Sequence, residues 1–290
     1  MAEEHRQIDP VTGTATTGHE WDGIQELNTP LPRWWLWLFY VTIIWSVGYW
    51  VVYPAWPLVT DATKGVFGYN SRAAVVEDIK DLHAMRGPMM QQLASASTAE
   101  IAASPQLIDF ARAQGRVAFA DNCAPCHGAG GGGAKGYPNL NDDDWLWGGK
   151  LADIEQTIRF GIRGGHDSGH QGNMPPFKDV LKPAEMSAVA DYVRSLSGLS
   201  TEAGVDLKAG QKVFADNCAV CHGEAGKGNR EVGAPNLTDR IWLYGSDKAT
   251  IVQGLQQGRG GVMPVWEGRL SEPVIKALAV YVYGFGGGEK

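Results

Sequence analysis

The sequence Phe-Ala-Asp-Asn-Cys-Ala-Pro-Cys-His-Gly occupies residues 119–128, and Phe-Ala-Asp-Asn-Cys-Ala-Val-Cys-His-Gly occupies residues 214–223. Both copies contain the pattern C-x-x-C-H, in which two thiols can bond covalently to a haem and the adjacent imidazole can bind its iron. The thiols and imidazoles concerned are those of Cys123, Cys126, His127, Cys218, Cys221 and His222. We therefore expect two covalently bound haems c, each with a histidine as its proximal iron ligand.

A zinc site, a dithiol redox pair and a structural disulfide also use a pair of cysteines at this spacing. None of the three needs the histidine that follows both pairs. All four cysteines of the chain lie in the two motifs, so no separate disulfide framework is expected. The motifs favour haem attachment over these alternatives without excluding them.

The similarity between the two halves of the chain extends beyond the motifs. Gly115 and Phe119 precede the first motif as Gly210 and Phe214 precede the second, and each pair lies one helical turn apart. A glycine at that point lets a second helix cross closely. Matching helical segments at 189–196 and 275–283 end the two repeats and are the expected partners. We predict a mainly α fold with two tandem helical haem domains, at 104–199 and 200–290.

The two repeats differ by one insertion. Residues 154–161 align with 251–258 at an offset of 97, whereas the final helices align at an offset of 89. The first repeat therefore has eight extra residues between Gly161 and Met174, and they include His166 and His170.

Each repeat also offers one methionine followed by proline at an equivalent position, Met174 and Met263. A thioether opposite an imidazole stabilises ferrous iron and raises the reduction potential. We expect Met174 to be the sixth ligand of the first haem and Met263 that of the second. Two alternatives remain: both methionines are ordinary core residues, or His166 or His170 replaces Met174.

Two prolines are candidates for supporting the proximal histidines. The carbonyl groups of Pro138 and Pro235 are expected to accept a hydrogen bond from Nδ1 of His127 and His222 respectively. Such a bond fixes the ring and strengthens it as a ligand.

The part of the chain before the repeats divides into three segments. Residues 1–33 form a polar, acidic arm. Residues 34–57 are uncharged and mostly apolar, with aromatic residues at both ends, and are long enough to cross a bilayer core of about 30 Å. Residues 58–103 form a spacer with a short amphipathic helix, which is expected to end at Gly87 and Pro88.

A buried core helix and a cleaved signal peptide are alternatives to a membrane anchor at 34–57. A small-residue cleavage site does not follow this segment, which disfavours the signal peptide. Basic residues flank both ends, so charge does not orient the anchor. Bacteria attach haem at C-x-x-C-H on the outer face of the inner membrane, so we expect the haem domains in the periplasm and the arm in the cytoplasm. The net charge of −7 and the lack of a basic patch argue against nucleic acid as a partner.

The anchor begins with Asn28-Thr-Pro-Leu-Pro-Arg-Trp-Trp-Leu-Trp37 and ends with Tyr53-Pro-Ala-Trp-Pro57. These sequences resemble the membrane-anchored dihaem subunit III of cbb3-type cytochrome c oxidases, and the resemblance covers essentially the whole chain. It implies two class I cytochrome c domains and an electron-transfer subunit without a catalytic centre of its own. It also implies a periplasmic cytochrome c as electron donor, and a monohaem subunit and a catalytic, oxygen-reducing and proton-pumping subunit as partners.

Two other functions fit the same residues. The chain could be the membrane-anchored cytochrome subunit of a periplasmic dehydrogenase, which would run electrons in the opposite direction. It could also be a dihaem peroxidase. Peroxide chemistry needs an accessible iron position, so a methionine in both repeats disfavours the peroxidase.

Overall fold

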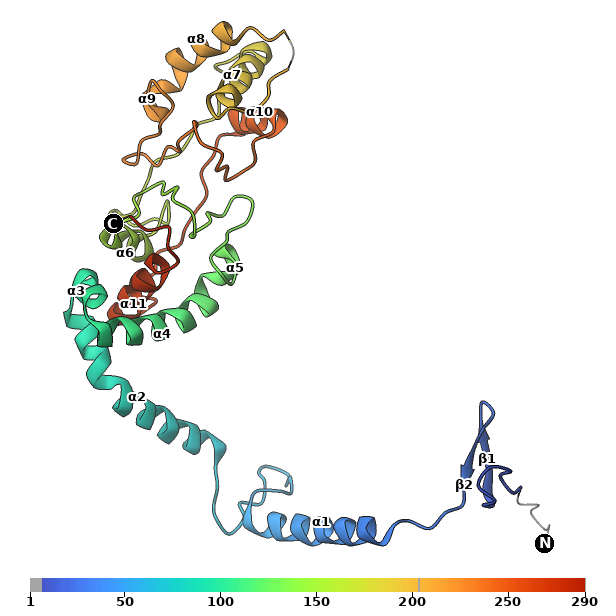
Figure 1. Cartoon of the computed structure of the whole chain (residues 1–290). Helices are drawn as coiled ribbons and strands as arrows, with labels where there is room; N and C mark the ends of the chain where they lie inside the picture. Colours follow the sequence, from blue (N-terminus) through green and yellow to red (C-terminus); the bar gives the residue numbers. More distant parts are fainter. Residues whose placement is uncertain (1–6, 203, 290) are drawn as a thin grey trace. The chain divides into compact units, whose positions relative to one another are not determined.

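The computed structural model describes residues 7–202 and 204–289 (Figure 1). The chain divides into two compact units, and the boundary between them in the sequence falls between His83 and Ala84. Its elements are, in order, β1 (Thr16–Trp21), β2 (Ile24–Leu27), α1 (Arg33–Val52), α2 (Ser71–Ser95), α3 (Thr98–Ala103), α4 (Pro105–Asn122), α5 (Ala124–His127), α6 (Leu151–Phe160), α7 (Pro183–Leu196), α8 (Leu207–Asn217), α9 (Ala219–His222), α10 (Lys248–Gln257) and α11 (Glu272–Tyr283). The mainly helical fold agrees with the prediction.

The acidic arm contains a β-hairpin that the sequence analysis did not predict. Strands β1 and β2 are antiparallel, with Thr16 opposite Leu27. Asp22 and Gly23 join them, and both have positive φ angles, 49° and 85°. A two-residue turn of this kind matches the twist of a hairpin, and Asp-Gly is one of its preferred sequences.

Helix α1 is the one helix, among the described residues, that is long and apolar enough to cross a membrane. Its 20 residues span about 30 Å, the thickness of a bilayer core. It ends five residues before the predicted boundary at residue 57, because Tyr53 is extended. Tyr53 precedes Pro54, and a residue before proline disfavours helical geometry.

Helix α2 does not end at Gly87 and Pro88, so that prediction is wrong. The helix continues through Pro88 to Ser95, although an internal proline removes one backbone hydrogen bond. The reason is tertiary packing beyond the proline: Leu93 is fully buried in a cluster with Ile101 and Val280. Residues 84–103, which the sequence analysis assigned to the spacer, therefore pack within the second unit.

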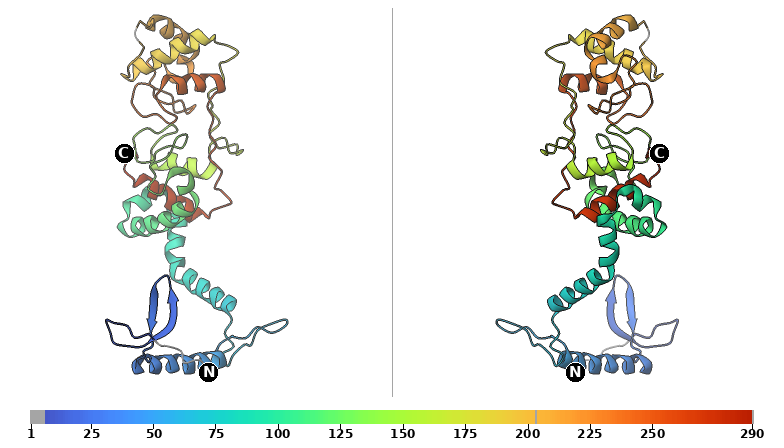
Figure 2. Two further views of the ribbon diagram at one scale, coloured as in Figure 1. Left: turned by 90° about the vertical axis from the view of Figure 1, so that its right-hand side faces the viewer. Right: turned by 90° about the vertical axis from the view of Figure 1, so that its left-hand side faces the viewer.

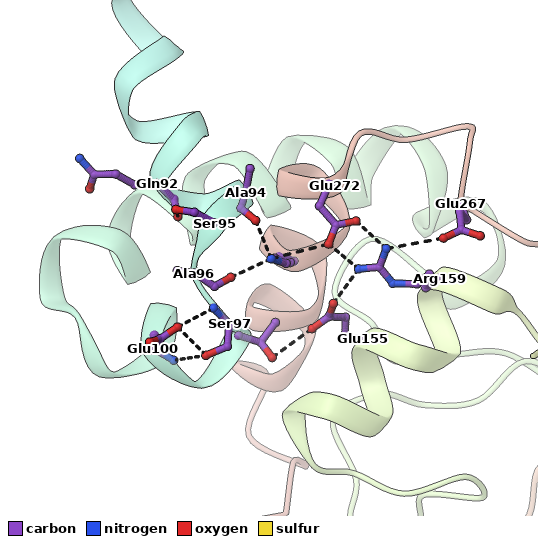
Figure 3. A network of polar contacts seen from close by, with 12 residues as sticks. Gln92, Ala94, Ser95, Ala96, Ser97, Glu100, Glu155, Arg159, Glu267 and Glu272 are labelled. Carbon is purple, nitrogen blue, oxygen red and sulfur yellow. Dashed lines mark hydrogen bonds and ion pairs between the residues drawn. The ribbon is translucent and has the colours of Figure 1, made fainter.

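Polar contacts also fix the end of α2 (Figure 3). Lys276, on α11, donates hydrogen bonds to the carbonyl oxygens of Ala94 and Ala96, each at 2.8 Å. A cation at a helix C-terminus satisfies carbonyls that lack partners within the helix. Nearby, Arg159 on α6 bonds to Glu155 and Glu272. These contacts join α2, α6 and α11.

The two repeats exchange their C-terminal helices. Helix α11, from the second repeat, packs against α4 of the first, and α7, from the first repeat, packs against α8 of the second (Figures 1 and 2). The crossing glycines receive a helix as predicted, but from the other repeat. A Cβ atom at Gly115 would lie 2.5 Å from the carbonyl oxygen of Ala277, and one at Gly210 would overlap the backbone of Ala188. The expectation that each repeat closes on itself is wrong.

Connectivity gives a physical reason for this exchange. Helices α7 and α8 are consecutive and joined by a short segment, and consecutive elements usually pack together. Once α7 covers α8, only the equivalent α11 is left to cover α4. Because the repeats carry matching surfaces, the exchanged pairing buries the same kinds of residues as the unexchanged one.

The exchange produces two cores. The first core surrounds the first motif and contains Phe119, Ile154, Ile158, Trp266, Ile275, Leu278, Ala279 and Val282. The second core surrounds the second motif and contains Leu181, Met186, Val189, Val193, Phe214, Cys218 and Leu255. Both cores therefore combine residues of both repeats. The second core lies within one continuous stretch of chain, whereas the first core joins two separate stretches.

Candidate haem-binding sites

The two motifs have the same local structure. Cys123 ends α4, and the single turn of α5 carries Cys126 and His127; α8 and α9 repeat this arrangement. Gly128 follows the first histidine with a φ of 77°. Only glycine adopts this geometry without strain, so the final residue of the motif turns the chain away from the histidine.

Each proximal histidine is bonded to the proline carbonyl that the sequence indicates. Nδ1 lies 3.0 Å from the carbonyl oxygen in both pairs, His127 with Pro138 and His222 with Pro235. Because a carbonyl can only accept, the proton must be on Nδ1, and Nε2 keeps its lone pair for a metal. Burial lowers the pKa of His222, and the bond to Pro235 opposes this shift. Burial therefore favours the neutral form that binds iron.

The first thiol of each motif is hard to ionise. Burial, and next the neighbouring cysteine, raise the pKa of Cys123 and that of Cys218 to about 11. Reactive dithiol pairs have lowered thiol pKa values instead. This difference disfavours the dithiol redox alternative.

The two methionines lie against the opposite motifs from those expected. Met263 packs against the first core, which includes Phe119 and borders Cys123. Met174 packs against the second core with Phe214 and Cys218. This packing differs from the predicted pairing of Met174 with the first motif and Met263 with the second, because the methionine segments are exchanged together with the C-terminal helices.

Backbone hydrogen bonds seat each methionine on the other repeat. Ile162 and Met263 exchange two N–H to carbonyl bonds of 3.0 Å, and Met174 and Arg259 exchange two of 2.9 Å. Ile162 follows Gly161, the C-cap of α6, and Arg259 follows Gly258, the C-cap of α10. Each methionine is thus fixed just beyond a helix of the other repeat: Met263 beyond α6, and Met174 beyond α10.

The second site has space for a large flat group. A cavity of about 1090 Å³ is lined by both cysteines of the motif, His222, Met174 and Trp242. The indole nitrogen of Trp242 is buried and has no hydrogen-bond partner among the residues that the structure describes. A buried N–H normally has an acceptor, so its orphaned state fits a bound group that carries carboxylates, as haem does. The residues present therefore fit the cofactor that the motif implies.

Trp242 was not recognised as a functional residue in the sequence, although its alignment with Trp145 was visible. The two indoles differ in the structure. The N–H of Trp145 donates to the carbonyl oxygen of Gly287, near the C-terminus. Of this aligned pair, Trp242 is therefore the one whose buried donor has no partner within the described part of the chain.

The two histidines of the insertion contact protein side chains. The ring of His170 stacks on Trp147 at 4.3 Å, and its Nε2 lies 3.0 Å from Oγ1 of Thr157. The ring of His166 stacks on Phe160 at 4.7 Å. Burial lowers the pKa of His170, which keeps this stacked ring neutral. The residue that lies against the first motif is Met263.

Family models match three successive segments. They are described as the N-terminal domain of cytochrome oxidase-cbb3, FixP, at residues 13–60; cytochrome c at residues 112–197; and cytochrome C oxidase, cbb3-type, subunit III, at residues 205–282. The second and third segments correspond to the two repeats, so the chain contains two cytochrome c domains.

Relatives match the chain over nearly its full length. A cbb3-type cytochrome c oxidase subunit FixP from Azorhizobium caulinodans is 64% identical, over 98% of this chain and 97% of the relative. A FixP from Bradyrhizobium sp. is 60% identical, over 99% of both chains. A cbb3-type subunit CcoP from Cereibacter sphaeroides is 49% identical, over 94% of this chain and 95% of the relative.

Proposed function

Because this chain belongs to the family of FixP and CcoP subunits of cbb3-type cytochrome c oxidases, we propose that it binds two haems c covalently, at Cys123 and Cys126 and at Cys218 and Cys221. The protein is the electron-transfer subunit of that oxidase complex. When bound, each haem supplies a centre that accepts and releases one electron. The chain's own residues set the ligands and the surroundings of that centre.

The proposed iron ligands are His127 with Met263 at the first haem, and His222 with Met174 at the second. The observation that carries this assignment is the packing of each methionine against the motif of the other repeat. A fixed pair of ligands keeps the iron closed to oxygen and peroxide. It also changes little between oxidation states, as electron transfer without bond chemistry requires.

Three further residues are proposed to support the haems. Pro138 and Pro235 hold the proximal imidazoles through the 3.0 Å bonds to Nδ1. The free N–H of Trp242 is available to a carboxylate of the second haem. The buried cores exclude water, which strengthens these polar contacts.

We propose the bacterial inner membrane as the location, with α1 in the lipid and the haem domains in the periplasm. The length of α1 and the site of covalent haem attachment support this topology. A periplasmic cytochrome c is the proposed electron donor, and the monohaem and catalytic subunits of the oxidase are the proposed acceptors. Protease added to spheroplasts should digest the haem domains and spare the arm. Protection of the haem domains would indicate the opposite orientation of α1.

The ligand assignment is tested with the second haem removed. In the full chain carrying Cys218→Ala and Cys221→Ala, one haem should remain, which also tests covalent attachment. In that background Met263→Ala should let the reduced protein bind carbon monoxide, whereas Met174→Ala should leave it closed. The reverse result would restore the pairing within each repeat. Fast, stoichiometric binding of carbon monoxide by the unmutated chain would contradict the role of electron carrier and favour that of a peroxidase.

A further inference from the structure

The eight-residue insertion of the first repeat forms a closed loop. We call the segment 162–173 the first crossing and the segment 259–262 the second crossing, since each leads from one core to the other. Within the first crossing, Arg163 donates its backbone N–H to the carbonyl of His170 at 2.6 Å, and His170 donates to Gly161 at 3.1 Å. Residues 163–170 therefore leave and re-enter the crossing at nearly the same point, and do not lengthen its path.

With the loop set aside, the two crossings correspond residue by residue. At the offset of 89, Gly172 matches Gly261, and each lies two residues before its methionine. The insertion therefore adds side chains to a connection that otherwise has the same length in both repeats.

Arg163, the first residue of the loop, bonds to both of these equivalent glycines. Its Nε donates to the carbonyl oxygen of Gly261 at 2.6 Å, and its Nη1 donates to that of Gly172. The backbone of Arg163 is left-handed, with φ at 53°, a geometry that is uncommon for residues other than glycine. One guanidinium therefore joins the two crossings at the same position of each.

The chemistry of arginine suits this role. The guanidinium is planar and carries five N–H donors in a fixed fork, so it can bridge two separate acceptors, and it stays charged at neutral pH. Partial burial lowers its pKa, and in such surroundings charge-assisted bonds are stronger than neutral ones. A lysine has a compact ammonium on a flexible stem and lacks this preorganised fork.

We propose that Arg163 is a positioning residue that holds both methionine segments in place for ligation, so that a single side chain controls how readily Met174 and Met263 leave their irons. This inference rests on the exchanged ligand pairs proposed above. Arg163 also lines the cavity of the second site, but it is not one of the proposed iron ligands. It acts through the two carbonyls that precede the ligands.

The test uses the intact full-length protein with Arg163→Gln and Arg163→Lys. Carbon monoxide can bind a reduced haem only when its methionine has dissociated, so the binding rate reports the open fraction. Losing a charge-assisted hydrogen bond corresponds to a factor of about ten. We expect Arg163→Gln to raise the carbon monoxide binding rate about tenfold at both haems and to weaken the sulfur-to-iron absorption band of the oxidised protein. Arg163→Lys should give a smaller increase.

Arg116→Gln is the matched control. It removes the same charge from an exposed position on α4 and should change neither rate by more than about twofold. Unchanged rates at both haems in Arg163→Gln would overturn the proposal, and so would a change at only one haem, because the inferred contact is shared.

Deleting residues 163–170 provides a second variant in case Arg163→Gln folds poorly. Joining Ile162 to Gln171 gives the first crossing the same length as the second, without the guanidinium. This variant should retain both haems and bind carbon monoxide as fast as Arg163→Gln; wild-type rates in it would also overturn the proposal. Fast binding of carbon monoxide by the unmutated chain, not limited by methionine dissociation, would instead refute the proposed ligation, so the two failures are distinguishable.

Discussion

The first and second cores are built from equivalent residues but from different arrangements of chain. The second core draws on one continuous stretch, from Met174 to Leu255. The first core joins residues 118–158 with residues 263–285. A sequence repeat therefore need not coincide with a folded body. The second core can form from local chain, whereas the first core requires the two ends of the haem-bearing unit to meet.

Producing the two parts of the haem-bearing unit as separate fragments should have the largest effect on haem ligation. A fragment of residues 162–262 contains the whole second core, together with Arg163 and Arg259, which bond to the Met174 segment, and should bind one haem closed to carbon monoxide. A fragment of residues 104–199 follows the sequence repeat but lacks Met263 and α11, which cover the first motif. It should give an open haem or fail to fold, as measured by carbon monoxide binding and circular dichroism. A closed, low-spin haem in 104–199 would show that the first repeat can close on itself.

Substitutions at the crossing glycines, Gly115 and Gly210, should each disturb one core and leave the other intact within the full chain. In Gly115→Ala the new Cβ would meet the carbonyl of Ala277 and the side chain of Tyr281. We expect this overpacking to reduce the free energy of unfolding by roughly 2 to 3 kcal/mol, with the spectral change confined to the first haem. Gly210→Ala should affect the second haem in the same way.

The control for both glycine variants is Val117→Ala, on an exposed position of α4, which should change stability by less than about 0.5 kcal/mol. Chemical denaturation followed at the haem bands measures these effects. Equal disturbance of both haems by Gly115→Ala would contradict the division into two cores.

Local features of the sites could be read from the sequence because neighbouring residues determine them. The histidines, their proline partners, the crossing glycines and the presence of two Met-Pro segments all follow from short motifs. Partner choice could not be predicted, since Met174 and Met263 have equivalent surroundings and either pairing satisfies the same pattern. The passage of α2 through Pro88 depends on the burial of Leu93 by distant helices. No local pattern contains that information.

A contact that belongs to the first core alone should have a smaller effect. Lys276 is largely buried, with 12% of its side chain exposed, and bonds to two carbonyls at the end of α2. The equivalent residue beside the second core, at the offset of 89, is Ser187. Lys276→Met should reduce the free energy of unfolding by roughly 2 kcal/mol.

This loss should appear in denaturation followed at the first haem. Lys212→Met removes an exposed lysine beside the second core, paired with Asp216, and should cost less than about 0.5 kcal/mol. If the two variants are equally stable, the contact between Lys276 and α2 does not support the first core.

The smallest expected effect depends on pH. Burial, and next the charges of Asp239 and Asp142, raise the pKa of Asp144 from 3.8 to about 6. The folded protein therefore binds this proton more tightly than the unfolded chain, and stability falls as pH rises from about 4 to 6. The second repeat has Ile241 at the equivalent position, so this pH dependence should arise from the first repeat alone.

Replacing the carboxylate tests this source of pH dependence. Asp144→Asn should raise the free energy of unfolding at pH 7 by roughly 1 kcal/mol, after allowance for solvent screening, and flatten its slope between pH 4 and 6. The adjacent, exposed Asp143→Asn removes the same charge and is the control. Unfolding curves at several pH values measure both; an unchanged slope in Asp144→Asn would assign the titration to another group.

The position of α11 after the first motif in the chain orders events during synthesis. The ribosome completes the first attachment motif long before it makes Met263 and α11, which cover that motif. At typical rates of elongation the delay is on the order of ten seconds. During that interval Cys123 and Cys126 lie in a chain that cannot yet close, and the enzymes that join haem to thiols have access to them. The first haem should therefore be attached to an open segment, and Met263 and α11, which are exported later, should enclose it.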